Sequence, residues 1–205
     1  ENKNIAFIGD TKKGKFEIGE DLAKRMLQVT GNPNNRSNSD VILPWINAAD
    51  IVQTPKKLWI IDFGIDMSLA EASQYETPFE YVKKHVKPAR DKVRSKKERE
   101  KWWIHGRPSP KMREAIRNLP RCIVTPEVSK YRLFAWVKDK VNIAHRLYIF
   151  ACSDDYFFGV LHSKPHEIWS LHTGGRMGDG KDGGRPVYNL GRCFETFPFP
   201  WSPNQ

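Results

Sequence analysis

The chain has 205 residues, 39% of them hydrophobic, including 7 Trp and 11 Phe, so it can bury a full core and is not a disordered sequence. Its three cysteines are far apart and odd in number, which argues against a disulfide framework and fits a reduced cytoplasm. No apolar run approaches the roughly 18 residues that a bilayer-spanning helix needs, so we expect no membrane partner. Residues 83–117 hold 14 Lys/Arg against 4 Asp/Glu and alone account for the formal net charge of +10, which favours a polyanionic partner.

The first third of the chain predicts short strands, loops and helices around a core. Residues 4–9 and 59–63 predict buried strands, because both are short apolar runs bounded by turn signals. Residues 10–19 form a polar, lysine-rich loop, and 31–39 a turn-rich one. The segment 41–51 mixes strand and turn signals. Helices are expected at 20–28, where apolar residues share one face, and at 68–74, where Ser68 is the predicted N-cap.

The basic stretch begins in a helix that starts near Pro78. Four apolar residues at steps of four, three and four then predict one buried stripe, with the cations on the other faces: Val82, Val86, Ala89 and Val93. Pro88 either kinks this helix or begins a new one. Another helix is expected from Ser109-Pro110 to Leu119.

Strands dominate the next part of the chain, at 121–125, 133–137 and 148–152, followed by helices at 154–162 and 165–171. The glycine-rich segment 174–185 predicts a mobile loop rather than a regular element. Residues 194–201 are aromatic and extended, and we expect them to pack across the body. The sequence therefore predicts one α+β domain over 1–205, with short antiparallel strands and flanking helices around one core.

The basic stretch has two interpretations. One is a long solvated helix, in which mixed charges are ordinary. The other is a nucleic-acid surface, because acidic residues are too scarce to pair the cations and Trp102 and Trp103 follow directly.

Several catalytic signatures are present only in part. The glycine and lysine spacing of 175–181 matches a phosphate-binding loop, but Asp182 replaces the Ser/Thr that holds magnesium. Residues 32–35 (Asn-Pro-Asn-Asn) lack the second Pro and the aromatic of an adenine methyltransferase loop. We therefore expect no catalytic residue and no cofactor in this segment.

Two metal sites are possible from the residue types, and the sequence disfavours both. Asp179 and Lys181 could form a magnesium-dependent nuclease site with Asp154 or Asp155, although a glycine loop is a poor support for metal ligands. A zinc site could combine His162 and His166 with Cys152 or His172, although Pro165 interrupts the helix between the two histidines. The sequence predicts no bound metal.

The chain resembles the target recognition domain of MmeI-like type II restriction-modification enzymes, which join a nuclease, an adenine-N6 methyltransferase and a DNA-reading domain in one polypeptide. The closing Phe-Glu-Thr-Phe-Pro-Phe-Pro block is its most distinctive match. The segments that carry the resemblance, in chain order, are 4–9, 32–34, 39–41, 44–47, 59–63, 86–90, 101–103, 123–126, 129–130 and 194–200.

The resemblance implies a domain cut from a longer polypeptide, which reads duplex DNA in the major groove from loops on one side. It implies variable loops at 127–145 and 172–189, where the sequence also places charged residues on turns between strands. The candidates for base contact are Lys130, Arg132, His172, Arg176, Asp179, Lys181 and Arg185. The candidates for phosphate contact are Arg90, Arg94, Lys96, Lys97, Arg107, Lys111 and Arg113.

For the parent enzyme, the resemblance implies S-adenosylmethionine as cofactor, Mg²⁺ for any cleavage, and a methyltransferase domain of the same polypeptide as partner. Two other functions stay open, namely a metal-dependent nuclease and a non-catalytic module that binds RNA or protein.

Overall fold

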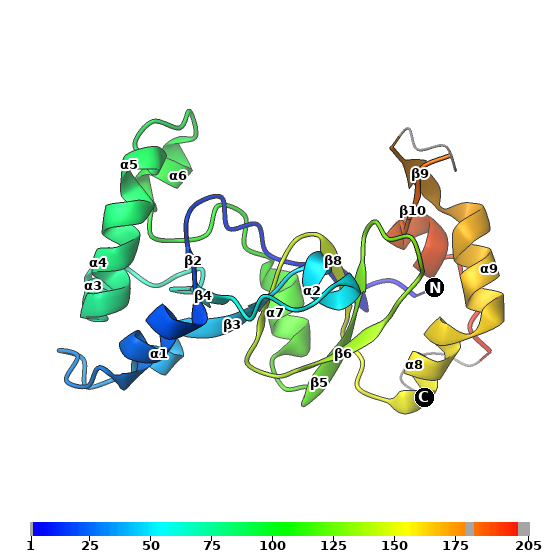
Figure 1. The fold of residues 1–205 in the computed structure, drawn as a ribbon, viewed down its shortest axis with the longest axis horizontal. Coiled ribbons are helices and arrows are strands. Elements are labelled where there is room, and N and C mark those ends of the chain that lie inside the picture. The colour runs from blue at the N-terminus through cyan, green and yellow to red at the C-terminus, as the bar shows by residue number, and fades with distance from the viewer. Residues whose placement is uncertain (1, 179–182, 201–205) are drawn as a thin grey trace.

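The computed structural model describes residues 2–178 and 183–200 (Figure 1). It confirms an α+β fold, built from two four-stranded sheets, one small hairpin and flanking helices. Within the described ranges, every helix is too short or too polar to cross a lipid bilayer.

The first sheet is entirely antiparallel and lies at the centre of the molecule (Figure 1). Its strands follow the order β1 (Ala6–Ile8), β8 (Leu147–Phe150), β5 (Arg121–Pro126) and β6 (Ala135–Lys138). Successive residues of β5 enter different cores. Ile123 packs with aromatic residues on one face, whereas Val124 joins an aliphatic cluster on the other.

Helices cover both faces of this sheet. On the aromatic face lie α8 (Asp155–His162), α9 (Lys164–Thr173) and the short π-helix η2 (Leu190–Phe194). On the aliphatic face, α7 (Pro110–Ile116) contributes Met112, and α2 (Ala48–Val52) packs Ile51. Because helices cover both faces of the sheet, the sequences of β5 and β8 are apolar at nearly every position.

The second sheet has the order β2 (Glu17–Ile18), β4 (Trp59–Ile61), β3 (Ile42–Ile46) and β7 (Asn142–Ile143). Only the β3–β7 pair is parallel. Its core also receives α1 (Glu20–Gln28), α3 (Leu69–Ser73) and α4 (Glu76–His85), while the one-turn helix η1 (Asn38–Asp40) precedes β3. The chain passes from β7 directly into β8, and this connection joins the two sheets.

The long basic helix is not formed, which corrects the expectation of a single stripe. The helix α4 ends at His85, and two short helices follow, α5 (Lys87–Arg90) and α6 (Lys96–Glu100). Val82 and Val86 are fully buried as expected, but the side chain of Ala89 is exposed. Pro88 lies in the first turn of α5, because its fixed φ suits a helix start and its missing N–H is not needed there.

The glycine-rich segment also differs from the expectation, because both of its ends are regular. The strands β9 (Gly175–Met177) and β10 (Arg185–Val187) pair as an antiparallel hairpin. The last described residues behave nearly as predicted. After η2, Phe197 is buried and Phe199 stacks on Phe157 at a centroid distance of 5.0 Å.

Candidate nucleic-acid interface

Three of the residues predicted to contact bases line one hollow of about 750 Å³ (Lys130, Arg176 and Arg185). Lys130 comes from the loop between β5 and β6, and the two arginines come from the β9–β10 hairpin. The two stretches that the resemblance implies are variable, 127–145 and 172–189, therefore meet in space. Exposed Leu171 and Met177 complete the apolar part of the hollow.

Backbone hydrogen bonds hold the β5–β6 loop against the hairpin. Val128 forms an isolated antiparallel bridge with Val187, and the Ser129 amide donates to the Pro186 carbonyl at 3.2 Å. The Tyr188 amide donates to the Glu127 carbonyl at 2.8 Å. Backbone pairing of this kind fixes the position of the cations that line the hollow.

Arg132 is a correction to the base-contacting set. Its guanidinium lies 4.8 Å from the centroid of the Tyr188 ring and donates to the Pro126 carbonyl at 2.6 Å and to the Thr125 hydroxyl at 3.0 Å. Burial lowers the pKa of Arg132. This arginine therefore stabilises the base of the loop and does not line the hollow.

The other predicted base contacts have different environments. His172 is exposed in the last turn of α9 and does not line the hollow. Arg176 donates to the Gly184 carbonyl at 3.1 Å across the hairpin. Asp179 and Lys181 lie outside the described residues. Whether any of these groups contacts a base stays a prediction.

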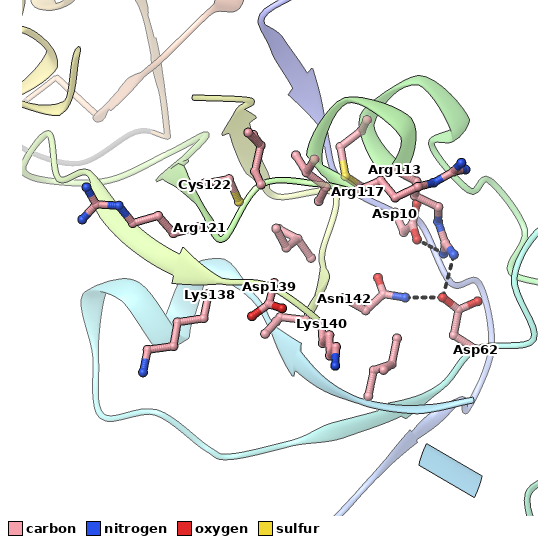
Figure 2. A pocket seen from close by; sticks show the side chains of 16 residues that line it. Asp10, Asp62, Arg113, Arg117, Arg121, Cys122, Lys138, Asp139, Lys140 and Asn142 are labelled. Carbon is pink, nitrogen blue, oxygen red and sulfur yellow. Dashed lines mark hydrogen bonds and ion pairs between the residues drawn. The ribbon is translucent and has the colours of Figure 1, made fainter. Parts of the chain in front are cut away.

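Arg113 is a second correction, this time to the phosphate-contacting set. It bridges two buried carboxylates, those of Asp10 and Asp62, and its distance to the Asp62 carboxylate is 2.8 Å (Figure 2). Burial disfavours the charged form of Arg113, but the attraction of Asp62 and Asp10 outweighs it and raises its pKa. The guanidinium holds α7 against the ends of two strands and is not free for DNA.

The network around Arg113 closes the inner end of a second hollow, of about 320 Å³, between α7 and the β6–β7 turn (Figure 2). The walls are mostly apolar, with Leu43, Met112 and Ile143 among them. Asn142 donates to Asp62 at 2.5 Å at its inner end. Five cations and three carboxylates are among its lining residues, and the charged end of Arg113 is paired with those of Asp10 and Asp62 (Figure 2).

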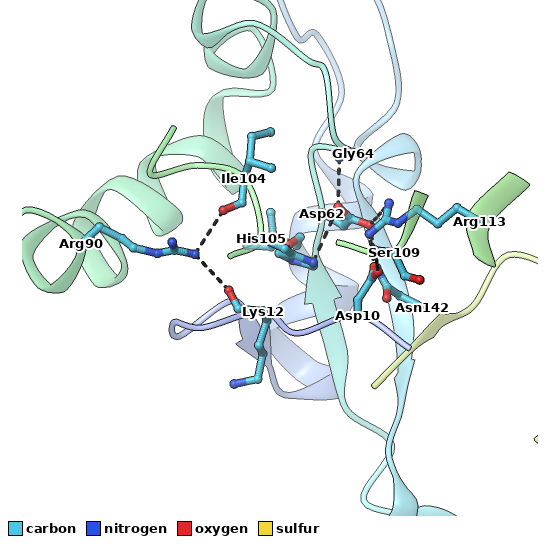
Figure 3. Close-up of polar contacts among 11 residues, drawn as sticks. Asp10, Lys12, Asp62, Gly64, Arg90, Ile104, His105, Ser109, Arg113 and Asn142 are labelled. Carbon is cyan, nitrogen blue, oxygen red and sulfur yellow. Dashed lines mark hydrogen bonds and ion pairs between the residues drawn. The ribbon is translucent and has the colours of Figure 1, made fainter. Parts of the chain in front are cut away.

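Arg90 is the third correction and was also predicted to contact phosphate. Its side chain is 2% exposed, and its guanidinium donates to the carbonyls of Lys12 at 3.0 Å and Ile104 at 3.2 Å (Figure 3). The Glu98 carboxylate forms an ion pair with the same guanidinium at 3.1 Å. Arg90 therefore ties α5 to two loops, and its charge is used inside the fold.

The tryptophans of the basic stretch are buried as well. Trp102 and Trp103 are each 7% exposed, and the Trp103 indole donates to the Met67 carbonyl at 2.9 Å. Trp102 packs on Phe79 with ring centroids 5.4 Å apart. These rings belong to the core of the second sheet, so they do not form the aromatic part of a nucleic-acid surface.

The remaining five phosphate-contact candidates are exposed: Arg94, Lys96, Lys97, Arg107 and Lys111. Lys97 and Arg107 line a hollow of about 410 Å³ beside α6. Lys96 forms only a loose pair with Glu100, at 3.7 Å and largely exposed. These side chains have the freedom that phosphate contact requires.

A lysine-rich loop between β1 and β2 extends the cationic surface and was absent from the predicted contacts. Its Lys13 pairs with Glu98 of α6 at 2.7 Å, and Lys15 is exposed. Thr11 forms an isolated bridge with Arg107, which places the two basic segments side by side. The signal was present in the sequence as a lysine-rich loop, but its pairing partner lies far along the chain.

Figure 1 shows how the two groups of cations are arranged. The α5–α6 segment and the β9–β10 hairpin project on the same side of the view, at opposite ends of the longest axis, with the sheets below them (Figure 1). The segments that carry the predicted phosphate contacts and the predicted base contacts therefore lie at opposite ends of one side of the fold (Figure 1).

One group of acidic and histidine side chains in the described part of the chain has the spacing of a metal site, namely Asp10, Asp62 and His105. Their ligand atoms lie within 4.8 Å of one another, and all three residues are buried. Burial raises the pKa of Asp62, but His105, Arg113 and the Gly64 amide favour its charged form and hold the pKa below the usual carboxyl value. Arg113 already pairs with both carboxylates, so these residues fit an ion-pair network better than a metal site.

The nuclease alternative receives little support from its described residues. Asp154 caps α8 by accepting from the Phe157 amide at 2.7 Å, and Asp155 pairs with Arg121 at 2.9 Å. The zinc alternative is also disfavoured, because both ring nitrogens of His166 have hydrogen-bond partners. One contacts the Leu161 carbonyl at 2.8 Å and the other the Tyr188 hydroxyl at 3.0 Å. Both sets of side chains have structural roles.

No protein-family profile matches the chain. No curated protein matches it. Among solved structures, it is similar to the type IIL restriction-modification enzyme MmeI in complex with DNA, with a TM-score of 0.71 and 16% sequence identity. The match covers 94% of this chain and 24% of the enzyme, so the chain spans about a quarter of that protein's length. At this identity the likeness shows a shared fold.

Proposed function

We propose that this chain is a sequence-specific recognition domain for double-stranded DNA. The observation that carries the proposal is the meeting of the β5–β6 loop and the β9–β10 hairpin in one hollow, lined by Lys130, Arg176 and Arg185. Arginine can donate two hydrogen bonds to guanine in the major groove, and lysine can donate to the same acceptors. The fold shared with an enzyme solved in complex with DNA supports the same partner.

The exposed cations at the α5–α6 end have a different role in this proposal. They contact phosphates and so orient the duplex, without selecting a sequence. The distance between the two ends of the fold suits such a division, since the backbone can be held at one end while the hairpin reaches base edges at the other (Figure 1).

The proposal extends to the parent protein. There the domain positions a site for an adenine methyltransferase domain of the same polypeptide, in a bacterial restriction-modification system. S-adenosylmethionine would bind to that other domain, and Mg²⁺ would be needed only if the parent also cleaves DNA. No residue of the present chain is assigned to either group.

The test combines selection from a random duplex pool with two substitutions that each remove one positive charge. Arg185→Ala is expected to relax preference at one base pair by about 1–3 kcal/mol, because a base contact is lost. Lys96→Ala is expected to weaken binding to all sequences alike and to reduce the dependence of log K on log salt by about one.

Two outcomes would contradict this proposal. If the chain shows no salt-dependent duplex binding, the DNA function fails, because phosphate contacts release counterions. If Arg185→Ala weakens specific and random duplexes equally, as is expected for Lys96→Ala, the hairpin does not read sequence. Stronger binding to duplex RNA would instead favour the RNA-binding alternative, since an A-form groove does not admit the same loops.

A further inference from the structure

Tyr131 is the most exposed large hydrophobic residue in the described part of the chain, with 64% of its surface accessible. It lies at the tip of the β5–β6 loop, next to Lys130 of the DNA-reading hollow. Tyrosine rings carry a large apolar area and are usually mostly buried. An exposed tyrosine ring beside a proposed binding surface is therefore a candidate contact for the bound partner.

The loop holds Tyr131 in place from both sides. Before the tip, Ser129 is buried and bonded to Pro186 of the hairpin. After the tip, Arg132 is fixed by its hydrogen bonds to the Pro126 carbonyl and the Thr125 hydroxyl. The ring is thus presented from a supported backbone, and little loop ordering remains to oppose binding.

The neighbours of the ring suit a nucleic acid. The Lys130 ammonium lies 5.3 Å from the centroid of the Tyr131 ring, and no carboxylate is among the described residues that line the adjacent hollow. Cations beside an exposed aromatic form the usual combination for holding a phosphate backbone and stacking on a base at the same time.

We infer that Tyr131 is a base-stacking residue, whose ring packs on a nucleobase that is displaced from the helical stack of duplex DNA. The inference rests on the proposed function, because it requires the duplex to lie at the hollow. Stacking uses the face of the base and not its edge, so Tyr131 strengthens binding without selecting a sequence. Displacement is easiest where the base is already unpaired.

The test compares a fully paired duplex with one that is identical except for a single extra, unpaired adenine in one strand. Affinities of the full 205-residue chain are measured by fluorescence anisotropy at several salt concentrations. The wild-type chain is expected to prefer the bulged duplex by about 5- to 150-fold, the range of one aromatic–base stack.

Three variants isolate the ring. Tyr131→Ala should bind both duplexes equally, and Tyr131→Phe should keep the preference, because the ring remains. Tyr156→Ala is the matched control, since it removes another exposed tyrosine, 43% accessible, from α8. Unfolding midpoints should be unchanged in the two Tyr131 variants, because the ring of Tyr131 is exposed.

The outcomes separate the inference from the proposed function. Salt-dependent binding to the paired duplex with no preference for the bulge would overturn the stacking role alone. If Tyr131→Ala still prefers the bulged duplex, the stacking role is overturned as well. Contact of the Tyr131 ring with another protein surface would then be the remaining interpretation. Absence of binding to either duplex would overturn both proposals.

Discussion

Arg113 provides the sharpest test of the structural account, because a sequence-based expectation assigns it to phosphate and the structure assigns it to the interior. Replacing it with Met keeps a side chain of similar length but leaves two carboxylates without their cation. The side chains of Asp10 and Asp62 are 0% and 2% exposed, so water cannot take over the role of the guanidinium.

The size of the effect follows from what remains around the two carboxylates. Asp10 keeps its bond from the Ser109 amide at 2.7 Å, and Asp62 keeps those from Gly64 and Asn142. The attraction between opposite charges about 4 Å apart is about 4 kcal/mol at an effective dielectric constant near 20. The variant loses this attraction but also avoids the cost of desolvating the Arg113 guanidinium, which partly offsets the loss. We therefore expect a loss of about 3–5 kcal/mol in the free energy of unfolding.

The assay is urea unfolding followed by tryptophan fluorescence at pH 7.5. With a slope of about 2 kcal/mol per M, the midpoint should fall by about 1.5–2.5 M. Arg117→Met, at the C-terminal cap of the same helix, is the matched control. Its partner Glu114 is exposed, so the loss should stay below about 1 kcal/mol.

The pH dependence distinguishes buried charge from lost packing. In the wild type, the lowered pKa of Asp62 stabilises the fold above the ordinary carboxyl pKa, and this stability is lost as pH falls through the lowered value. In Arg113→Met, Asp62 loses a cation that lowers its pKa, so the deficit should shrink as the pH falls toward 5. A loss below 1 kcal/mol, or a deficit independent of pH, would refute the charge argument.

Two further predictions concern the aromatic side of the first sheet. Burial lowers the pKa of His166 from 6.5 to about 4, so the unfolded chain takes up a proton first, and the free energy of unfolding should fall by roughly 3 kcal/mol as the pH drops from 7 to 4. Urea titrations between pH 7 and pH 4 measure this fall in the wild type and in His166→Asn, which has no imidazole to titrate. Equal falls in the two proteins would contradict the prediction. A Cβ at Gly174 would lie 2.5 Å from the Val187 carbonyl oxygen, whereas one at Gly175 meets nothing closer than 3.9 Å. Gly174→Ala should therefore cost about 1–3 kcal/mol and speed amide exchange in β10, and equal behaviour of Gly175→Ala would argue against the close approach.

Much of the fold could be predicted where the signal is local. The helix at 20–28 has the expected bounds, because its apolar residues repeat at helical spacing and Gly19 precedes it. Ser68 caps its helix with Glu71 as the reciprocal partner, since this capping box needs only four residues of sequence. The strands near 121–126 and 147–150 are equally plain, because they are apolar on both faces.

The hairpin could not be predicted for the opposite reason. Each of its strands has three residues, which is too short for an alternating pattern to be recognised among glycines. Its position depends on the bridge between Val128 and Val187, which are far apart in sequence. Which residues meet in the hollow is therefore a property of tertiary pairing, although the two stretches that form it were identified from the chain.

The net charge of a segment is a weaker guide to a binding surface than the set of cations that the fold leaves without an internal role. In the densest basic stretch, Arg90 and Arg113 are neutralised inside the protein by carboxylates and carbonyls that lie 8 to 103 residues away. The hollow at the hairpin carries fewer cations, but Arg176 and Arg185 come from paired strands, which fix their positions. Under the proposed function, a sequence-reading site needs donors at fixed positions, whereas a backbone clamp needs only loosely held charge. The hairpin end suits the first role and the α5–α6 end suits the second.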